Sequence, residues 1–190
     1  MANANYATGL KPVRRVSGAP YNNALRRYSA PSSYATSLFI GDPVIKTGTA
    51  DAQGYPEINA AANGGFITGV VVGFEDPASM TLGYGAASTT RAVLVADDPE
   101  LLFEIQEDAV GGTLALASVG LNCDLISAAG STFNRVSGWM LDTSTAATTA
   151  TLQVKILEFQ HRPDNEIPSA NSKVLVKINK HTELAGVVGI

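Results

Sequence analysis

The stretch "RAVLVADDPELLFEIQED", residues 91–108, indicates the fold class. Its apolar residues gather in two short runs rich in branched and aromatic side chains, Ala92–Ala96 and Leu101–Gln106, which is typical of strands. Between them lies Asp97–Pro99, where an aspartate side chain can accept from the backbone ahead and proline fixes its own φ. The stretch therefore predicts a strand, a turn and a return strand.

The same design recurs on either side of this stretch. Residues 38–46, "LFIGDPVIK", and residues 66–77, "FITGVVVGFEDP", also break or end a β-type run at an aspartate–proline pair. Residues 173–180, "KVLVKINK", place three branched apolar side chains on one strand face. Residues 113–126 could hold one short helical turn, and helix is otherwise scarce.

The strongest alternation lies in "ATLQVKILEFQ". Leu152, Val154 and Ile156 share one face of the predicted strand, whereas Gln153 and Lys155 share the polar face. Taken together, about seven to ten short strands predict an all-β protein, a sandwich or barrel of jelly-roll-like type. The tail "HTELAGVVGI" is expected either to pair as a last strand or to dock on a neighbouring molecule.

Composition and charge limit the possible functions. The chain has 190 residues, of which 45% are hydrophobic and 16% charged, so it can bury a core but has few charges for a soluble domain. Residues 1–41 hold five Lys/Arg and no acid, whereas residues 42–190 hold eight Lys/Arg and 17 acids. An acidic body argues against a general nucleic-acid binder. No apolar run reaches the roughly 18–20 residues of a membrane span.

The basic end of the chain is predicted to be a separate unit. Residues 1–37 combine three prolines and four tyrosines without strand or helix periodicity, which favours an extended basic arm, with residues 38–190 as the β-rich body. An arm that folds back on its own domain is the alternative. Removing residues 1–30 is expected to leave a folded body. The predicted partner-binding residues of the arm are Tyr6, Lys11, Arg14, Arg15, Tyr21, Arg26, Arg27 and Tyr28.

Catalytic chemistry is not indicated. The two histidines, His161 and His181, lie at polar strand ends that we expect to be exposed, and no G-x-S-x-G elbow is present. Cys123 and Trp139 are expected in the core, and the acidic residues 97–100 read as a solvated turn. We therefore predict a non-enzymatic protein with no catalytic residues, no metal site and no cofactor.

The order of the landmarks carries a resemblance. "TGLKPVRRVSGAPYN" is followed by "LFIGDPVIKTG", "ITGVVVGFE", "LVADDPELLFEIQED", "VGLNCDLI", "SGWMLD" and "LQVKILEF". Along nearly its whole length the chain resembles the small virion structural proteins of tailed bacteriophages that decorate or cement the capsid. The resemblance implies a β-rich protein that binds the major capsid protein, often as a homotrimer, in the virion and, during assembly, in the host cytoplasm.

Two other readings stay open. The arm could bind nucleic acid, with Arg14, Arg15, Arg26 and Arg27 on phosphates and the tyrosines stacked on bases. Alternatively, the chain could be another virion part, such as a head-completion or tail-tube protein, or a carbohydrate-binding sandwich. A single tryptophan argues against the last of these.

Overall fold

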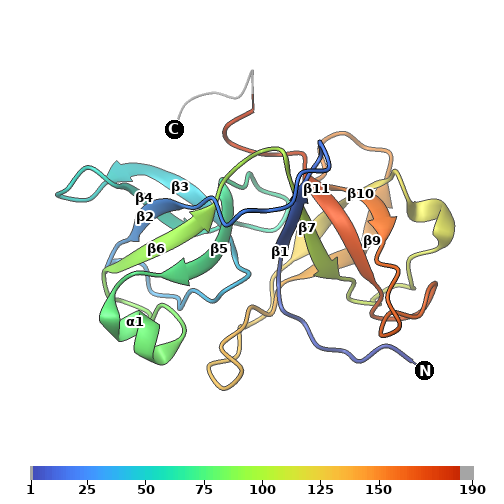
Figure 1. Ribbon diagram of the computed structural model, residues 1–190, viewed down its shortest axis with the longest axis horizontal. Helices are drawn as coiled ribbons and strands as arrows, with labels where there is room; N and C mark the ends of the chain where they lie inside the picture. The colour runs from blue at the N-terminus through green and yellow to red at the C-terminus, as the bar shows by residue number, and fades with distance from the viewer. Residues whose placement is uncertain (1, 185–190) are drawn as a thin grey trace.

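The computed structural model describes residues 2–184, and these residues are almost entirely β (Figure 1). They form eleven strands, a short α-helix, α1 (Pro77–Leu82), and one 3₁₀ turn, η1 (Leu116–Ser118). The strands are β1 (Lys11–Arg15), β2 (Arg26–Ala30), β3 (Pro43–Ala50), β4 (Pro56–Ala60), β5 (Gly69–Phe74), β6 (Arg91–Ala96), β7 (Leu101–Gln106), β8 (Asn122–Ile126), β9 (Met140–Ala147), β10 (Val154–Phe159) and β11 (Lys173–Ile178). The all-β prediction is confirmed.

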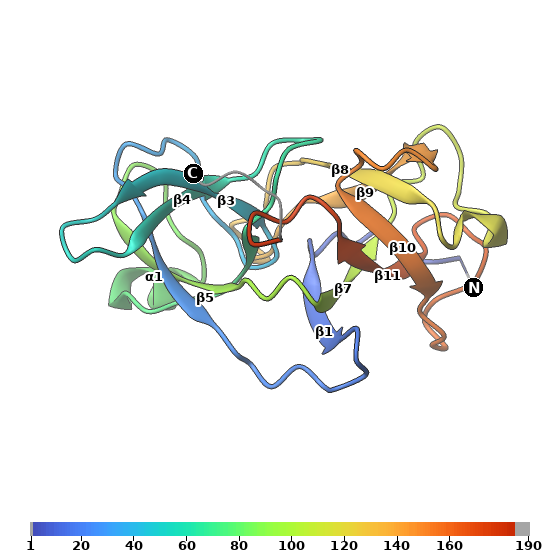
Figure 2. The ribbon, with the colours of Figure 1, turned by 90° about the horizontal axis from the view of Figure 1, so that it is seen from above.

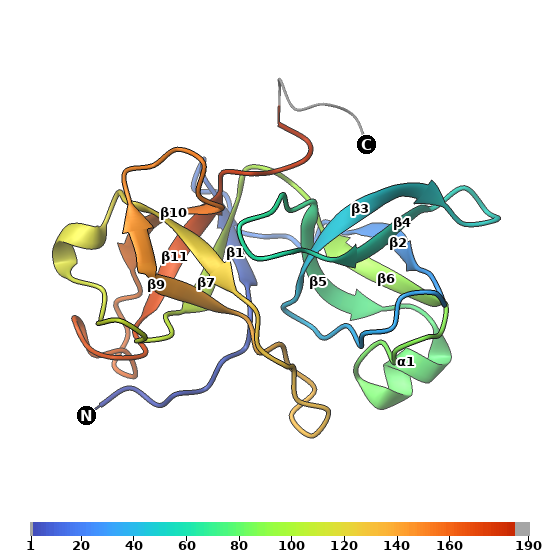
Figure 3. The ribbon, with the colours of Figure 1, turned by 180° about the vertical axis from the view of Figure 1, so that it is seen from behind.

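The strands build two units that lie side by side along the longest axis (Figures 1 and 3). One is a closed barrel in the order β2-β4-β3-β5-β6, and the other is a six-stranded sheet in the order β1-β7-β11-β10-β8-β9. All the strand pairs are antiparallel except β2–β4. The six-stranded sheet curls far enough for Glu107, just after β7, to form an isolated bridge with Leu141 of β9.

The predicted hairpin at Asp97–Pro99 is wrong in its pairing. Both strands exist, but β6 pairs with β2 and β5 in the barrel, whereas β7 pairs with β1 and β11 in the other sheet. All six residues of β7 are buried, so this strand needs covering neighbours on both of its faces and edges. Asp97–Pro99 is therefore the connection between the two units rather than a return turn (Figure 2).

Apolar packing joins the two units. One core cluster lies inside the barrel around Tyr28 and Val93. The larger cluster lies under the six-stranded sheet and extends to Ile67, Val70 and Ala96 of the barrel half. Because these side chains are buried against both units, separating the barrel from the sheet would expose apolar surface at a cost of about 25 cal/mol per Å².

The predicted arm, residues 1–37, is not separate from the body, because it supplies β1 and β2 to the two sheets. β1 lies in register against β7, with Lys11 opposite Glu104, and β2 pairs with β4 and β6 to close the barrel. Leu10 is 1% exposed and Tyr28 is fully buried. The alternative that residues 1–37 fold back on their own domain is the arrangement observed, because this segment carries apolar side chains that the two cores require.

A close backbone approach fixes the start of this segment. Gly9 and Gly41 both have positive φ, +66° and +98°, and the Leu10 N–H donates to the Gly41 carbonyl at 2.9 Å. A Cβ atom on Gly9 would lie 2.3 Å from the Gly41 oxygen, and one on Gly41 would lie 2.2 Å from the Thr8 oxygen. Only glycine fits at either position.

Gln153 shows where alternation fails as a guide to burial. Val154 and Ile156 of β10 are buried as predicted, but Gln153, predicted on the polar face, is fully buried too. Its Oε1 accepts from the N–H groups of Gly64 and Leu125, both at 2.9 Å. Its Nε2 donates to the carbonyls of Ala62 and Gly65 at 3.0 and 2.9 Å. This amide therefore ties the loop after β4 to the six-stranded sheet.

Helix is limited to two short segments within residues 2–184. The aspartate–proline break after β5 opens into α1, where the Asp76 carboxylate accepts from the Ser79 N–H at 2.8 Å and Gly83 ends the helix with φ 76°. The turn predicted within residues 113–126 is η1. Most of the tail "HTELAGVVGI" lies outside the described residues, so the prediction for it stays open.

Candidate functional site

The four predicted partner-binding arginines are paired within their own chain. Each guanidinium lies close to a carboxylate of the region after residue 41. These pairs are Arg14–Glu158 at 2.5 Å, Arg15–Asp98 at 2.6 Å, Arg26–Asp97 at 3.2 Å and Arg27–Glu75 at 3.2 Å. Exposed pairs of this kind contribute about 0–1 kcal/mol each. Four of the five basic side chains of residues 1–41 are thus each paired with a carboxylate of the acidic body, while the arginine side chains stay 42–61% exposed.

The predicted tyrosine and lysine contacts divide into exposed and buried positions. Tyr6 is 51% exposed and Lys11 is also exposed. Tyr21 is partly buried, and its phenol oxygen has no hydrogen-bond partner. Tyr28 is fully buried and donates to Asp97 at 2.7 Å, and burial raises the pKa of its phenol. The prediction that Tyr28 contacts another molecule is therefore wrong, because its ring fills the barrel core.

Exposed apolar side chains mark a different surface, which we call the α1 patch: Met80, Leu82 and Phe133. Phe133 is 92% exposed, at the tip of a hairpin closed by a bridge between Ser131 and Val136. A Cβ atom on Gly83 would lie 2.5 Å from Cδ of Arg135, so the end of α1 contacts this hairpin. Both project from the same side of the molecule (Figures 1 and 3).

A second group, the η1 patch, consists of Val110, Leu116 and Val119. Their exposed fractions are 62%, 61% and 44%. They belong to the loop between β7 and β8, which lies at the far end of the long axis from α1 (Figure 1). Neither patch can be predicted from sequence patterns, because isolated apolar residues in loops have no periodicity.

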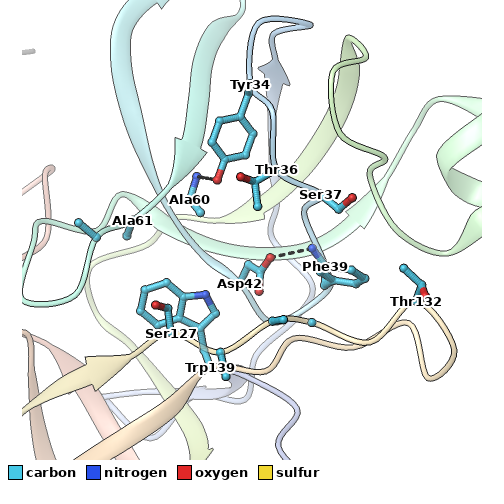
Figure 4. A pocket seen from close by; sticks show the side chains of 14 residues that line it. Tyr34, Thr36, Ser37, Phe39, Asp42, Ala60, Ala61, Ser127, Thr132 and Trp139 are labelled. Carbon is cyan, nitrogen blue, oxygen red and sulfur yellow. Dashed lines mark hydrogen bonds between the residues drawn. The ribbon is translucent and has the colours of Figure 1, made fainter.

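A cleft of about 640 Å³ lies between the barrel and the segment that leads into β9 (Figure 4). Three aromatic side chains line it, those of Tyr34, Phe39 and Trp139, with alanines 60–62 and the hydroxyls of several serines and threonines. Trp139 is 5% exposed, so its predicted burial is confirmed. The Tyr34 hydroxyl accepts from the Ala60 N–H at 3.3 Å, and Phe39 stacks on Tyr84 outside the cleft.

Asp42 supplies the only carboxylate among the residues that line this cleft. It is 5% exposed, and Oδ2 accepts from the Phe39 N–H at 2.8 Å. Burial raises the pKa of Asp42 to about 6, although hydrogen bonds from the Ser137 hydroxyl and the Phe39 N–H oppose that rise. No ion pair to Asp42 is found among residues 2–184.

Asp42 should make stability fall as the pH rises. Below its ordinary pKa of 3.8 both the folded and unfolded states are protonated; above that pH only the unfolded state loses the proton readily, until the folded pKa of about 6 is passed. Asp42→Asn removes this titration. The change that it causes in the free energy of unfolding should therefore be more favourable at pH 7 than at pH 3.5, by roughly 3 kcal/mol. Urea unfolding at the two pH values measures this difference, and an equal effect at both would contradict it.

The groups that usually do chemistry are placed for structure. Cys123 is buried as predicted, and burial raises the pKa of its thiol to about 11. His181 was predicted to be exposed, but it is 1% exposed because it bridges to Ile67 between the two units, and burial lowers its pKa. His161 is exposed. Residues 2–184 hold no group of three or more His, Cys, Asp or Glu side chains placed to bind a metal ion.

Comparison with known protein families, with characterised proteins and with solved structures finds no match for this chain. Within residues 2–184, no helix has the length and apolar character needed to cross a membrane. Function is therefore inferred from the residues and their geometry.

Proposed function

We propose that this protein is a non-enzymatic virion structural protein that decorates or cements the capsid of a tailed bacteriophage by binding its major capsid protein. The observation that supports the proposal most is the presence of two separate groups of exposed apolar side chains, the α1 patch and the η1 patch, on a closely hydrogen-bonded β protein. One molecule with two such patches can contact two neighbouring shell subunits at once.

The physical demand on such a protein agrees with this arrangement. Densely packed DNA pushes the subunits of a phage head apart, so a cement protein must bury surface across subunit boundaries. A stable interface buries about 1,600 Å² in total, and a few aromatic or large apolar anchors supply most of its energy. Phe133 in the α1 patch and Leu116 in the η1 patch have this character. Repetition over the shell adds avidity.

The basic segment does not lie apart as a free arm, because β1 and β2 are strands of the six-stranded sheet and of the barrel. Its four arginines pair with the chain's own carboxylates, so docking through them would exchange four exposed ion pairs, each worth about 0–1 kcal/mol, for contacts to the partner. The same pairing weakens the nucleic-acid reading, because a phosphate would have to displace these carboxylates on a chain of net charge −4. Tyr6 and Lys11 are exposed members of the predicted contact set, and the four arginine side chains are exposed as well but ion-paired within the chain.

The test uses expanded, DNA-free shells of the major capsid protein that we propose as the partner. Binding is measured by co-sedimentation. Phe133→Ser should weaken binding at least about tenfold, since hot-spot aromatics contribute about 2 kcal/mol or more. Leu116→Ser, at the other patch, should also weaken it. Phe66→Ser is the matched control: Phe66 is 43% exposed but lies beside the junction residue Ile67, outside both patches.

Shell stability separates cementing from simple attachment. At protein concentrations that saturate binding, either patch variant should bind but give less protection of the shells against heating than wild type. Full protection by both variants would overturn the bridging role, and wild-type affinity of both would overturn the docking surface itself.

A further inference from the structure

The cleft of Figure 4 holds a buried carboxylate with no compensating cation among the described residues. Asp42 is held from the backbone side, where Oδ2 accepts from the Phe39 N–H, and its side chain lies at the centre of the labelled residues. Removing an ionised carboxylate from water without a partner costs several kcal/mol. A cation entering the cleft would offset that cost.

The walls suit the rest of such a ligand. Trp139 faces Asp42 across the cleft, and the Tyr34 and Phe39 rings lie nearby (Figure 4). Aromatic faces attract ammonium and guanidinium groups, and more strongly in a desolvated site. The small side chains of residues 60–62 and 128–130 leave room for an alkyl chain beside them. The volume of about 640 Å³ lies within the range of small-ligand sites, roughly 300–1,000 Å³.

We propose that this cleft binds an organic cation, an alkylammonium or alkylguanidinium group, with Asp42 as its counter-ion and Trp139 as its aromatic wall. Asp42 also holds its own turn by accepting from the Phe39 N–H and the Ser137 hydroxyl, but neither donor carries a charge that would balance the carboxylate. The site does not depend on the capsid role, and its ligand can be a free amine or a lysine or arginine side chain of another protein.

The single tryptophan makes the site directly observable. Its indole N–H gives one side-chain signal in a ¹H–¹⁵N NMR spectrum, and it lies in the cleft. Titration with n-butylammonium, n-butylguanidinium or Nα-acetyl-lysine-N-methylamide should shift this signal and saturate. The neutral analogue Nα-acetyl-norleucine-N-methylamide should not shift it at the same concentrations.

Asp42→Asn tests the counter-ion. The asparagine oxygen can still accept from the Phe39 N–H, so the turn keeps its support while the charge is removed. Affinity for the cations should fall at least about tenfold, as expected for a charge-assisted contact. Asp51→Asn, at a carboxylate outside the cleft, should leave the affinity unchanged. Unchanged binding by the Asp42 variant, or equal binding of the neutral analogue, would overturn the proposal.

The pH dependence gives an independent readout. The only other ionisable group lining the cleft is the Tyr34 phenol, so between pH 5 and 7 the affinity should follow Asp42 alone and rise about tenfold. A pH-independent affinity would overturn the role of Asp42. If the lysine amide binds more tightly than n-butylammonium, the ligand is a protein side chain. If n-butylammonium binds more tightly, the ligand is a free amine.

Discussion

Replacing Gln153 with leucine is expected to lower the free energy of unfolding by about 3–6 kcal/mol. The substitution keeps the volume similar but removes the partners of two N–H groups and two carbonyls around a fully buried side chain. Each buried polar group left without a partner costs about 1–3 kcal/mol, and the loop at residues 62–65 can recover part of that by rehydration. Urea unfolding followed by far-UV circular dichroism measures the loss.

Two further variants show that the hydrogen bonds, and not a general intolerance of mutation, are responsible. Gln53→Leu at an exposed position should change stability by less than about 0.5 kcal/mol. Gln153→Glu keeps the two acceptor contacts but places a carboxylate oxygen against the carbonyls of Ala62 and Gly65. It should therefore destabilise most at neutral pH, where that group is ionised. A Gln153→Leu protein within about 1 kcal/mol of wild type would contradict the assigned role.

The sequence could not have placed Gln153 in the core, because strand alternation fixes only which side chains share a face. It does not say what covers that face. Gln153 lies on the same strand face as Lys155. The loop after β4, nearly ninety residues away in the chain, crosses this face at Gln153 and buries its side chain. Where no distant loop intervened, as at Val174, Val176 and Ile178 of β11, the prediction was confirmed.

The N-terminal strands escaped prediction for a related reason. In β2, Arg26 and Arg27 are exposed while Tyr28, Ser29 and Ala30 are buried in succession, so the strand has no period of two. Its burial comes from β6, whose residues lie more than sixty positions later. The arginines looked unopposed for the same reason, since their carboxylate partners are distant in sequence.

The cleft also lies beyond what sequence patterns can indicate. Its lining comes from the stretches at residues 34–42, 60–62 and 127–139, and consists mostly of small side chains that have no motif. Trp139 was correctly assigned to the interior, but a buried tryptophan can pack a core and line a cleft at once. Only the fold brings Asp42 next to it.

Deleting residues 1–30 is expected to abolish the native fold, contrary to the prediction made from the sequence. The deletion removes β1 from the edge of the six-stranded sheet and β2 from the closed barrel, together with the buried side chains of Leu10 and Tyr28. Losing one large core side chain costs about 2–5 kcal/mol, so losing both removes about 4–10 kcal/mol of the roughly 5–15 kcal/mol by which a domain is stable. The loss of a barrel strand and its hydrogen bonds adds to this cost. Circular dichroism and thermal unfolding of the truncated protein test this.

A shorter deletion provides the control. Removing residues 2–8 eliminates the contacts of Asn3 with Glu166 and Ala170 and of Tyr6 with Gln106, but keeps Leu10 and both strands. That protein should fold and unfold cooperatively with a modest loss of stability. The longer truncation should instead aggregate, because the edges of β4 and β6 lose their partner in the barrel. If both deletions gave the same cooperative unfolding, β1 and β2 would be dispensable, and the N-terminal segment would again be free to serve as a docking arm.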